Sequence, residues 1–253
     1  MTVTGYKNLT QWLLEQAEID PQAKIDRHNT LLLVDCHKHF SDSNCRSLLI
    51  DQHRGIVGSP KETKRLLNEW LEQQTFGLIW QRSVQKSITK KERAESLVIV
   101  HGNSMFVPVK GATQHSTSWV AMHNLASKIY YLPNKPAIQL NFKMANASIL
   151  SLEMPANCSF FRRQYEIAQK MMLQQWQTWR SAAAELKIEE DSLLFKSCLA
   201  EVDRLEYIHP REIFNLYQRE LWECYIKGSW DEHCSPKEFE KNQKDVKRRY
   251  DYF

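Results

Sequence analysis

Glycine, proline and long apolar runs are all scarce in this chain of 253 residues. It has 7 glycines and 8 prolines, too few for a collagen-like or low-complexity sequence, and 42% of its residues are hydrophobic, which is typical of a compact core. No window approaches the roughly 18 consecutive apolar residues that a membrane-spanning helix needs. We therefore expect a globular protein without a membrane segment, built as one large domain or as a domain with an appendage.

A secretory signal and a disulfide framework are also missing from the sequence. The first residues, Met1 to Tyr6, lack the cationic and apolar regions of a signal peptide. The six cysteines are spread over a long chain rather than concentrated in a small one, which favours reduced thiols. These two features predict a cytoplasmic location.

Positive charge is concentrated in the middle of the chain. Residues 1–53 carry 5 basic and 7 acidic side chains, residues 54–180 carry 17 and 7, and residues 181–253 carry 12 and 16. The net charges are therefore −2, +10 and −4. A basic centre between acidic ends is the asymmetry expected when one part of a protein meets a polyanion, although ordinary solvated lysines give the same count.

Helix signals occur in the first third of the chain. Residues 8–17 have apolar side chains at helical spacing and end before Pro21. Ser59-Pro60-Lys61-Glu62 predicts a helix start with a hydroxyl at the N-cap and proline at the first helical position, followed by a helix ending near Gly77 in a left-handed cap. A further helix is predicted over residues 78–94.

Short apolar and alternating runs predict strands. Residues 31–34 and 48–50 are two such runs around a polar turn, which predicts a pair of strands. Met144 to Ala147 is a plausible hairpin turn between the last two of the later runs. The later strands are predicted at residues 97–100, 105–109, 119–122, 128–132, 137–142 and 148–152.

Helical spacing returns after Pro155 and continues toward the end of the chain. One stripe predicts a long helix with a core or partner-helix face, and two more helices are predicted around residues 194–205 and 214–224, before a charged tail. The fold class is therefore α+β, with mostly antiparallel strands, one to two helices in the core and an all-helical C-terminal extension. We expect an N-terminal helix and linker at 1–27, a core domain at 28–180 and the extension at 181–253. The first stripe consists of Phe161, Tyr165, Ala168, Met172, Trp176, Trp179 and Ala183.

Residues 78–94 are the best candidate for a binding surface. If this stretch is helical, four cations share one face, and each could contact a phosphate of DNA. Lys91 and Lys110 add further positive charge beside the strand-rich part and extend the set. The alternative to a DNA-binding surface is an ordinary solvated helix face with no partner. The predicted DNA-binding residues are Arg82, Lys86, Lys90, Lys91, Arg93 and Lys110.

Metal and catalytic interpretations are weak. Cys36, His37, His39 and Cys45 are close together, but their spacing does not match the usual zinc knuckles, and adjacent strand residues point to opposite faces. The His101 and His123 segments lack nearby acidic ligands for a nuclease metal, and no phosphate-binding glycine loop appears. We therefore expect no enzyme, no metal and no cofactor.

Five segments together resemble the competence transcription factor family, ComK, over roughly residues 28–176. They stand in the order and at the separations of that family's motifs. The segments are Phe76-Gly77 with Gln81-Arg82, Leu97 to Val100, Met105 to Val109, Ser118 to His123, and Ser159-Phe160 with Tyr165 and Ala168.

The match has departures. Gln81 replaces a glycine, Val109 replaces a threonine, His123 stands one place late, and Arg162-Arg163 replace an Asn-Gln pair. Arg82 and Trp119 are the positions that carry over, Arg82 as a DNA contact and Trp119 as a core residue. Residues 177–253 have no counterpart in the family.

The resemblance implies a transcriptional activator of DNA-uptake genes. Such a protein binds A/T-rich double-stranded DNA through the minor groove as a homodimer or higher oligomer, and a protease adaptor is a further candidate partner. The basic centre without a helix-turn-helix signal is compatible with minor-groove binding. The main rival is a protein-interaction adaptor that uses its amphipathic C-terminal helices and binds no DNA.

Overall fold

The structure, a computed structural model, describes residues 2–3, 9–37, 44–74, 77–91, 96–111 and 116–185. The predicted helices at 194–205 and 214–224 and the charged tail lie outside these residues. So does Arg93 among the predicted DNA contacts.

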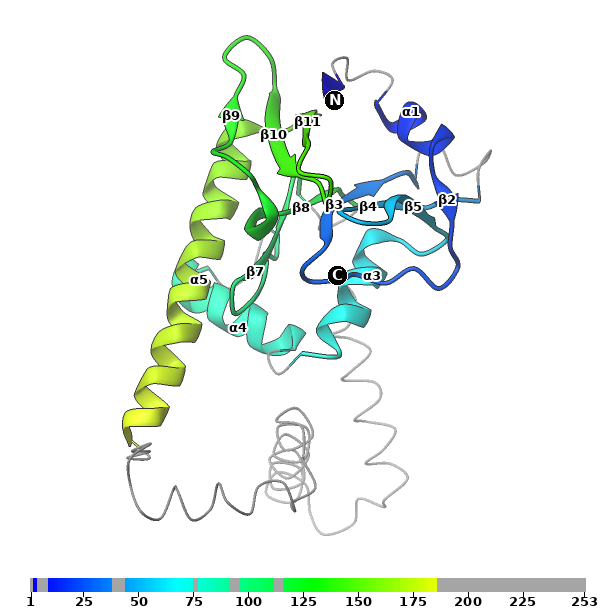
Figure 1. The fold of residues 1–253 in the computed structure, drawn as a ribbon. Helices are drawn as coiled ribbons and strands as arrows, with labels where there is room; N and C mark the ends of the chain where they lie inside the picture. Colours follow the sequence, from blue (N-terminus) through cyan, green and yellow to red (C-terminus); the bar gives the residue numbers. More distant parts are fainter. Residues whose placement is uncertain are drawn as a thin grey trace.

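Two β-sheets and four α-helices make up the described part of the chain (Figure 1). Most strand pairs are antiparallel; the two-residue strands β1 and β2 pair parallel to their neighbours. The α+β class is therefore confirmed, with four described helices where the sequence predicted one or two in the core. In the seven-stranded sheet, the strands lie in the order β2 (Glu18–Ile19), β5 (Gly55–Ser59), β4 (Ser47–Asp51), β3 (Thr30–Asp35), β8 (Trp119–Ala121), β7 (Ser104–Pro108) and β6 (Ile99–His101). In the four-stranded sheet, the order is β1 (Thr2–Val3), β11 (Ile149–Pro155), β10 (Ala137–Lys143) and β9 (Tyr130–Tyr131). The helices are α1 (Leu9–Glu15), α3 (Thr63–Leu71), α4 (Leu78–Thr89) and α5 (Cys158–Glu185), with a 3-10 helix η3 (Met122–Asn124) after β8.

The seven-stranded sheet is buried on both faces. The predicted strand pair at 31–34 and 48–50 is present as β3 and β4, which pair antiparallel. Leu32 and Val34 belong to the core that also contains the four-stranded sheet, α1 and α5, whereas Leu33 packs in a second core with α3. Because alternate strand residues point to opposite faces, burial on both sides explains the continuous apolar run.

The second hairpin also matches the sequence. Strands β10 and β11 pair over their full length around the predicted turn. In the turn, Ala147 has a φ of 61°, Met144 N–H donates to Ser148 O at 2.9 Å, and Ala147 N–H donates to Met144 O at 2.9 Å. Each of the six strands predicted between residues 97 and 152 is confirmed, with shifted ends.

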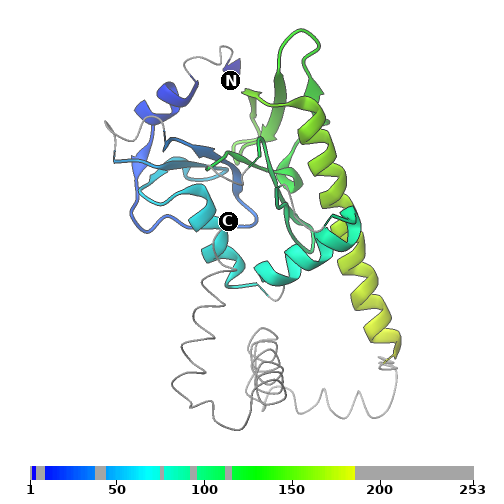
Figure 2. The same cartoon turned by 180° about the vertical axis from the view of Figure 1, so that it is seen from behind.

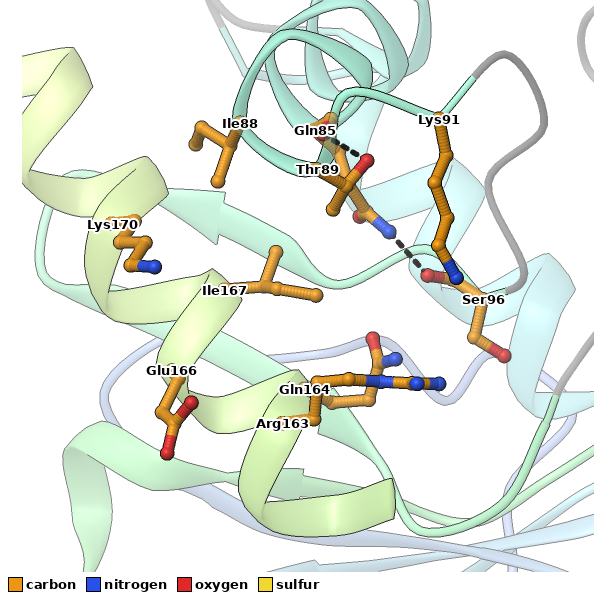
Figure 3. A pocket seen from close by; sticks show the side chains of 10 residues that line it. All are labelled: Gln85, Ile88, Thr89, Lys91, Ser96, Arg163, Gln164, Glu166, Ile167 and Lys170. Atoms are coloured by element: carbon orange, nitrogen blue, oxygen red, sulfur yellow. Dashed lines mark hydrogen bonds between the residues drawn. The ribbon is translucent and has the colours of Figure 1, made fainter. Parts of the chain in front are cut away.

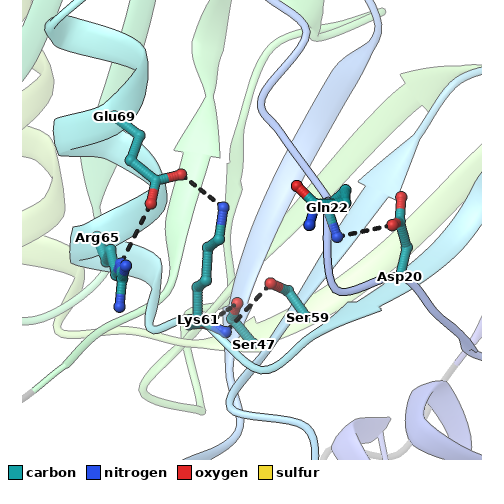
Figure 4. Close-up of polar contacts among 7 residues, drawn as sticks. All are labelled: Asp20, Gln22, Ser47, Ser59, Lys61, Arg65 and Glu69. Atoms are coloured by element: carbon teal, nitrogen blue, oxygen red, sulfur yellow. Dashed lines mark hydrogen bonds and ion pairs between the residues drawn. The ribbon is translucent and has the colours of Figure 1, made fainter.

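The start of α3 differs from the prediction. Ser59 is the last residue of β5, and its hydroxyl accepts the Lys61 N–H at 3.2 Å instead of capping a helix (Figure 4). Lys61 then forms an ion pair with Glu69 at 2.7 Å, and the helix begins at Thr63. The serine–proline pattern therefore forms the turn between strand and helix, because the backbone at Ser59 is held by strand pairing with Ser47.

The prediction that Gly77 ends this helix in a left-handed conformation was also wrong. Gly77 has a φ of −72° and is the N-cap of α4, and α3 already ends at Leu71. The left-handed cap belongs instead to Lys90, with a φ of 56°, so α4 ends at Thr89 rather than near Ala94.

Residues 9–27 pack into the same cores as the strands. The predicted N-terminal helix is present as α1, whose Leu9 and Leu13 are buried in the first core. Ala23 and Ile25 are buried in the second core, beside α3. This stretch is therefore integrated with the 28–180 region.

The long predicted helix is α5, which runs along one side of the molecule and extends past α4 (Figures 1 and 2). Its apolar stripe divides into two parts. Phe161 and Ala168 are buried and Met172 is half-buried, whereas Trp176 is 57% exposed and Trp179 is 54% exposed. The first half of the stripe is therefore a core face, and for the exposed second half the partner-helix alternative stays a prediction. No described helix has both the length and the apolar character needed to cross a bilayer.

Candidate nucleic-acid interface

Two glutamines fix the orientation of α4 against the edge of the seven-stranded sheet. Gln81 Nε2 donates to Val100 O at 2.5 Å, and Gln81 Oε1 accepts from Val100 N–H at 3.2 Å. Gln85 repeats the arrangement, donating to Ser96 O at 2.5 Å and accepting from Val98 N–H at 3.0 Å. Both side chains are buried, so α4 is attached to the sheet by amide–backbone hydrogen bonds in a dry site.

These glutamines determine where the predicted cations lie. Arg82 follows Gln81 and is half-buried, with contacts of its own. Lys86 follows Gln85 and is exposed. Residues four apart on a helix share a face, so Arg82 and Lys86 lie on one side of α4, turned away from the sheet edge.

The predicted row of four cations on one helix face does not form. The left-handed conformation of Lys90 ends the helix, and its N–H donates to Lys86 O at 2.8 Å. Lys90 and Lys91 are exposed in the segment that leaves the helix. Arg93 lies outside the described residues, so its predicted contact has no structural description. The predicted helix was too long because lysine has no intrinsic preference for the left-handed conformation, so nothing in the local sequence marked its end.

A cavity of about 230 Å³ lies between α4 and α5, at the end of α4 where Lys91 is found. Figure 3 shows Lys91 and Arg163 extending toward Ser96, with the Gln164 amide beside Arg163 and Ile167 between the two helices. Glu166 and Lys170 lie farther along α5 in the same view. The full lining is Gln85, Ile88, Thr89, Lys91, Ser96, Arg163, Gln164, Glu166, Ile167 and Lys170.

Lys110 lies in a loop whose next residue approaches Ser96, one of the residues that line the cavity. It is exposed and is followed by Gly111, where a Cβ would stand 3.8 Å from Ser96 Oγ. Lys91, Arg163 and Lys170 therefore line one cavity together with Ser96, and the backbone that follows Lys110 approaches the same serine. Lys90 and Lys110 are not among the lining residues. The sequence pattern missed both α5 residues as binding candidates. The available signal was two cations seven residues apart, flanking Ile167 on a helix whose pattern otherwise indicates core.

The histidines considered for a nuclease have structural roles. His123 Nε2 lies 2.7 Å from Arg27 O, and its Nδ1 lies 3.0 Å from Met105 N. Burial lowers the pKa of His123 and outweighs the hydrogen bonds with the backbone of Arg27 and Met105, which raise it. His101 packs edge-on against the Trp70 ring, with centroids 6.3 Å apart. Trp119, expected in the core from the family resemblance, is fully buried.

The cysteine and histidine group at the end of β3 is divided by burial. Cys36 and Cys45 are both fully buried, whereas His37 is exposed and His39 lies outside the described residues. Hydrogen bonding to Cys45 and burial raise the pKa of the Cys36 thiol. Cys45 Sγ donates to Ser47 O at 3.1 Å. Over the described ranges, no group of three His, Cys, Asp or Glu side chains is arranged to hold a metal ion.

Comparisons of this chain with protein families, with curated proteins and with solved structures found no match.

Proposed function

We propose that residues 28–180 form a DNA-binding domain of a transcriptional regulator. The protein would activate DNA-uptake genes, as the resemblance to the ComK family implies, and would bind A/T-rich duplex DNA through the minor groove. The observation that carries the proposal is the group of exposed lysines at the end of α4, Lys86, Lys90 and Lys91, with Lys110 in the adjacent loop.

The charge distribution supports a polyanionic partner. Residues 54–180 carry a net +10, and exposed lysines bind DNA mainly by displacing condensed counterions from phosphates. A/T-rich tracts have a narrow, strongly negative minor groove that attracts cations and needs no helix in the major groove. A site built from a helix end and a loop fits that mode.

A binding assay with two duplexes of equal length tests the proposal. The full chain is titrated with an A/T-rich and a G/C-rich duplex at physiological salt. We expect tighter binding to the A/T-rich duplex, because it supplies the narrow groove in addition to the phosphates that both duplexes share. Equal affinity for the two would refute selective binding.

A protein-interaction role is the second candidate, and one observation favours it. Leu173, Trp176 and Trp179 are exposed by more than half along the end of α5, with Arg180 stacked 5.2 Å from the Trp176 ring centroid. Large apolar side chains grouped on one surface often mark an interface. The proposed occupant is a second copy of this chain, which is the oligomer that the family resemblance implies.

Ionic strength separates the two roles. DNA binding should weaken steeply as salt rises, whereas an apolar helix interface should respond little. In sedimentation equilibrium, replacing Leu173 and Trp176 with Gln should weaken self-association, and Gln169→Ala on the same helix, at another exposed site, should not. A monomeric wild-type chain would exclude the α5 dimer while leaving DNA binding open to its own assay.

A further inference from the structure

We infer that the cavity between α4 and α5 binds a small phosphate monoester that also carries a hydroxyl group. This inference goes beyond DNA binding, since it concerns a free small molecule in a recess and not a duplex on the surface. It rests on three properties of the cavity: its charge, its size and one buried amide.

The lining has an excess of positive charge. Lys91, Arg163 and Lys170 contribute three cations, and Glu166 contributes one carboxylate. Arg163 also stacks 5.9 Å from the Phe160 ring centroid, which helps to hold its guanidinium in place. The cavity lies at the C-terminal end of α4, where the helix dipole is unfavourable for an anion, so the attraction must come from these side chains. A dianionic phosphate matches them better than a monoanion does.

The buried amide of Gln164 is the property that calls for a hydroxyl group on the ligand. It is 2% exposed, and its Oε1 has no hydrogen-bond partner among the described residues. A buried amide oxygen without a donor is unusual in folded proteins and is a reason to look for a ligand. An oxygen acceptor cannot bind phosphate itself, but it can accept a hydrogen bond from a hydroxyl attached to the phosphorylated molecule.

The size and the apolar side of the cavity limit the ligand. A volume of about 230 Å³ is smaller than the roughly 300–1,000 Å³ of sites for drug-sized molecules. Ile88 and Ile167 form an apolar wall between the charged ends. A three- to six-carbon phosphorylated polyol or sugar fits these limits.

Binding of glycerol 3-phosphate to the full chain, measured by calorimetry without DNA, tests the inference. Glycerol, which has no phosphate, and methyl phosphate, which has no hydroxyl, are the ligand controls. We expect saturable binding of glycerol 3-phosphate with a Kd of about 1 mM or tighter, weaker binding of methyl phosphate and none of glycerol. No saturable binding of glycerol 3-phosphate would overturn the inference, whatever the result of the DNA assay.

Variants locate the site. Replacing Arg163 and Lys170 with Gln should weaken binding by at least about tenfold, since both side chains would otherwise donate charge-assisted hydrogen bonds to the phosphate. Replacing the exposed Lys128 and Lys143 with Gln removes the same charge from residues that do not line the cavity, and should leave binding unchanged. Equally weakened binding in the two double variants would mean that only net charge matters, which would refute the cavity as the site.

Gln164→Leu tests the amide separately. It should reduce the affinity for glycerol 3-phosphate to that for methyl phosphate and leave methyl phosphate binding unchanged. Circular dichroism establishes whether this variant folds, and if it does not, the Arg163 and Lys170 pair still decides the question. If DNA phosphates occupied the cavity instead, the Arg163 and Lys170 variant would lower the salt dependence of DNA binding while glycerol 3-phosphate bound neither protein, and the inference would fall.

Discussion

His123 joins Arg27 to the strand that carries Met105. Its Nε2–H donates to Arg27 O at 2.7 Å, because a carbonyl oxygen only accepts, and its Nδ1 then accepts the Met105 N–H at 3.0 Å. Both contacts are satisfied by the neutral ring. The imidazole thus connects two segments that lie far apart in the sequence.

Protonation of His123 should destabilise the fold. Burial lowers its pKa in the folded protein below the ordinary value of 6.5, so the unfolded chain binds the proton more readily. The stabilising contribution is fully present above about pH 6.5 and is lost as the pH falls through the lowered folded value. Urea unfolding between about pH 7.5 and pH 5 should show a falling free energy of unfolding, with part of that fall absent in His123→Gln. His53→Gln, at an exposed site, is the control, and an unchanged pH profile in His123→Gln would contradict the assignment.

Gln81→Leu should lower the free energy of unfolding by about 1–3 kcal/mol, because it leaves the buried Val100 N–H without a partner. Val100 O still accepts from Gln175 Nε2 at 2.6 Å, so only one group is left without its hydrogen bond. Urea denaturation measures the change. Gln169→Leu makes the same replacement at an exposed position of α5 and should cost little; similar destabilisation of both proteins would show that the Gln81 amide is not needed.

Lys86 and Lys90 should contribute to DNA affinity, whereas the basic tail should not. Replacing both with Ala should flatten the dependence of log affinity on log salt by up to about 0.9 for each phosphate that is no longer neutralised, for every DNA sequence alike. Lys247 and Arg248 belong to a segment of net charge −4, whose acidic neighbours weaken its attraction for DNA. Their replacement with Ala should leave the slope unchanged. A lower slope for the tail variant alone would place the DNA on another part of the chain.

Metal removal should leave the protein folded. Cys36 and Cys45 are buried, whereas His37 is exposed, so these side chains do not share one site. The purified protein should contain less than stoichiometric zinc, and a chelator should not change its circular dichroism spectrum or its melting temperature. Stoichiometric zinc together with unfolding in chelator would overturn this prediction.

Elements set by local pattern were predictable from the sequence, and elements set by distant contacts were not. The β10–β11 hairpin follows from two apolar runs and a polar turn. Strand β5 was missed because it contains Gly55 and Gly58, and glycine weakens the strand signal. At Gly58 a Cβ would stand 2.5 Å from Ile19 Cδ1 and 3.1 Å from Cys45 Sγ. Glycine is needed at this position because Ile19 and Cys45, which come from other segments of the chain, leave no room for a side chain.

In the candidate site, too, the residues set by local sequence pattern were predictable and those set by distant contacts were not. The lysines on and after α4 were predicted because charge and helical spacing are local. The roles of Gln81 and Gln85 were not, because a glutamine in a helix is typical of a surface position until the strand edge beside it is known. Arg163, Gln164 and Lys170 required the packing of α5 on α4, which no short segment of sequence specifies.

The strand edges of this fold limit how copies of the chain can assemble. An open sheet edge is a template on which another chain can add a strand. At the β6 edge, Gln81, Gln85 and Gln175 already occupy backbone groups at Ser96, Val98, Val100 and Gly102. The other described edge strands, β1, β2 and β9, are two residues long. Joining of sheets between copies is therefore disfavoured in the described part of the chain. An oligomer would instead form through side-chain surfaces, where a single substitution can dissociate it without disturbing either sheet.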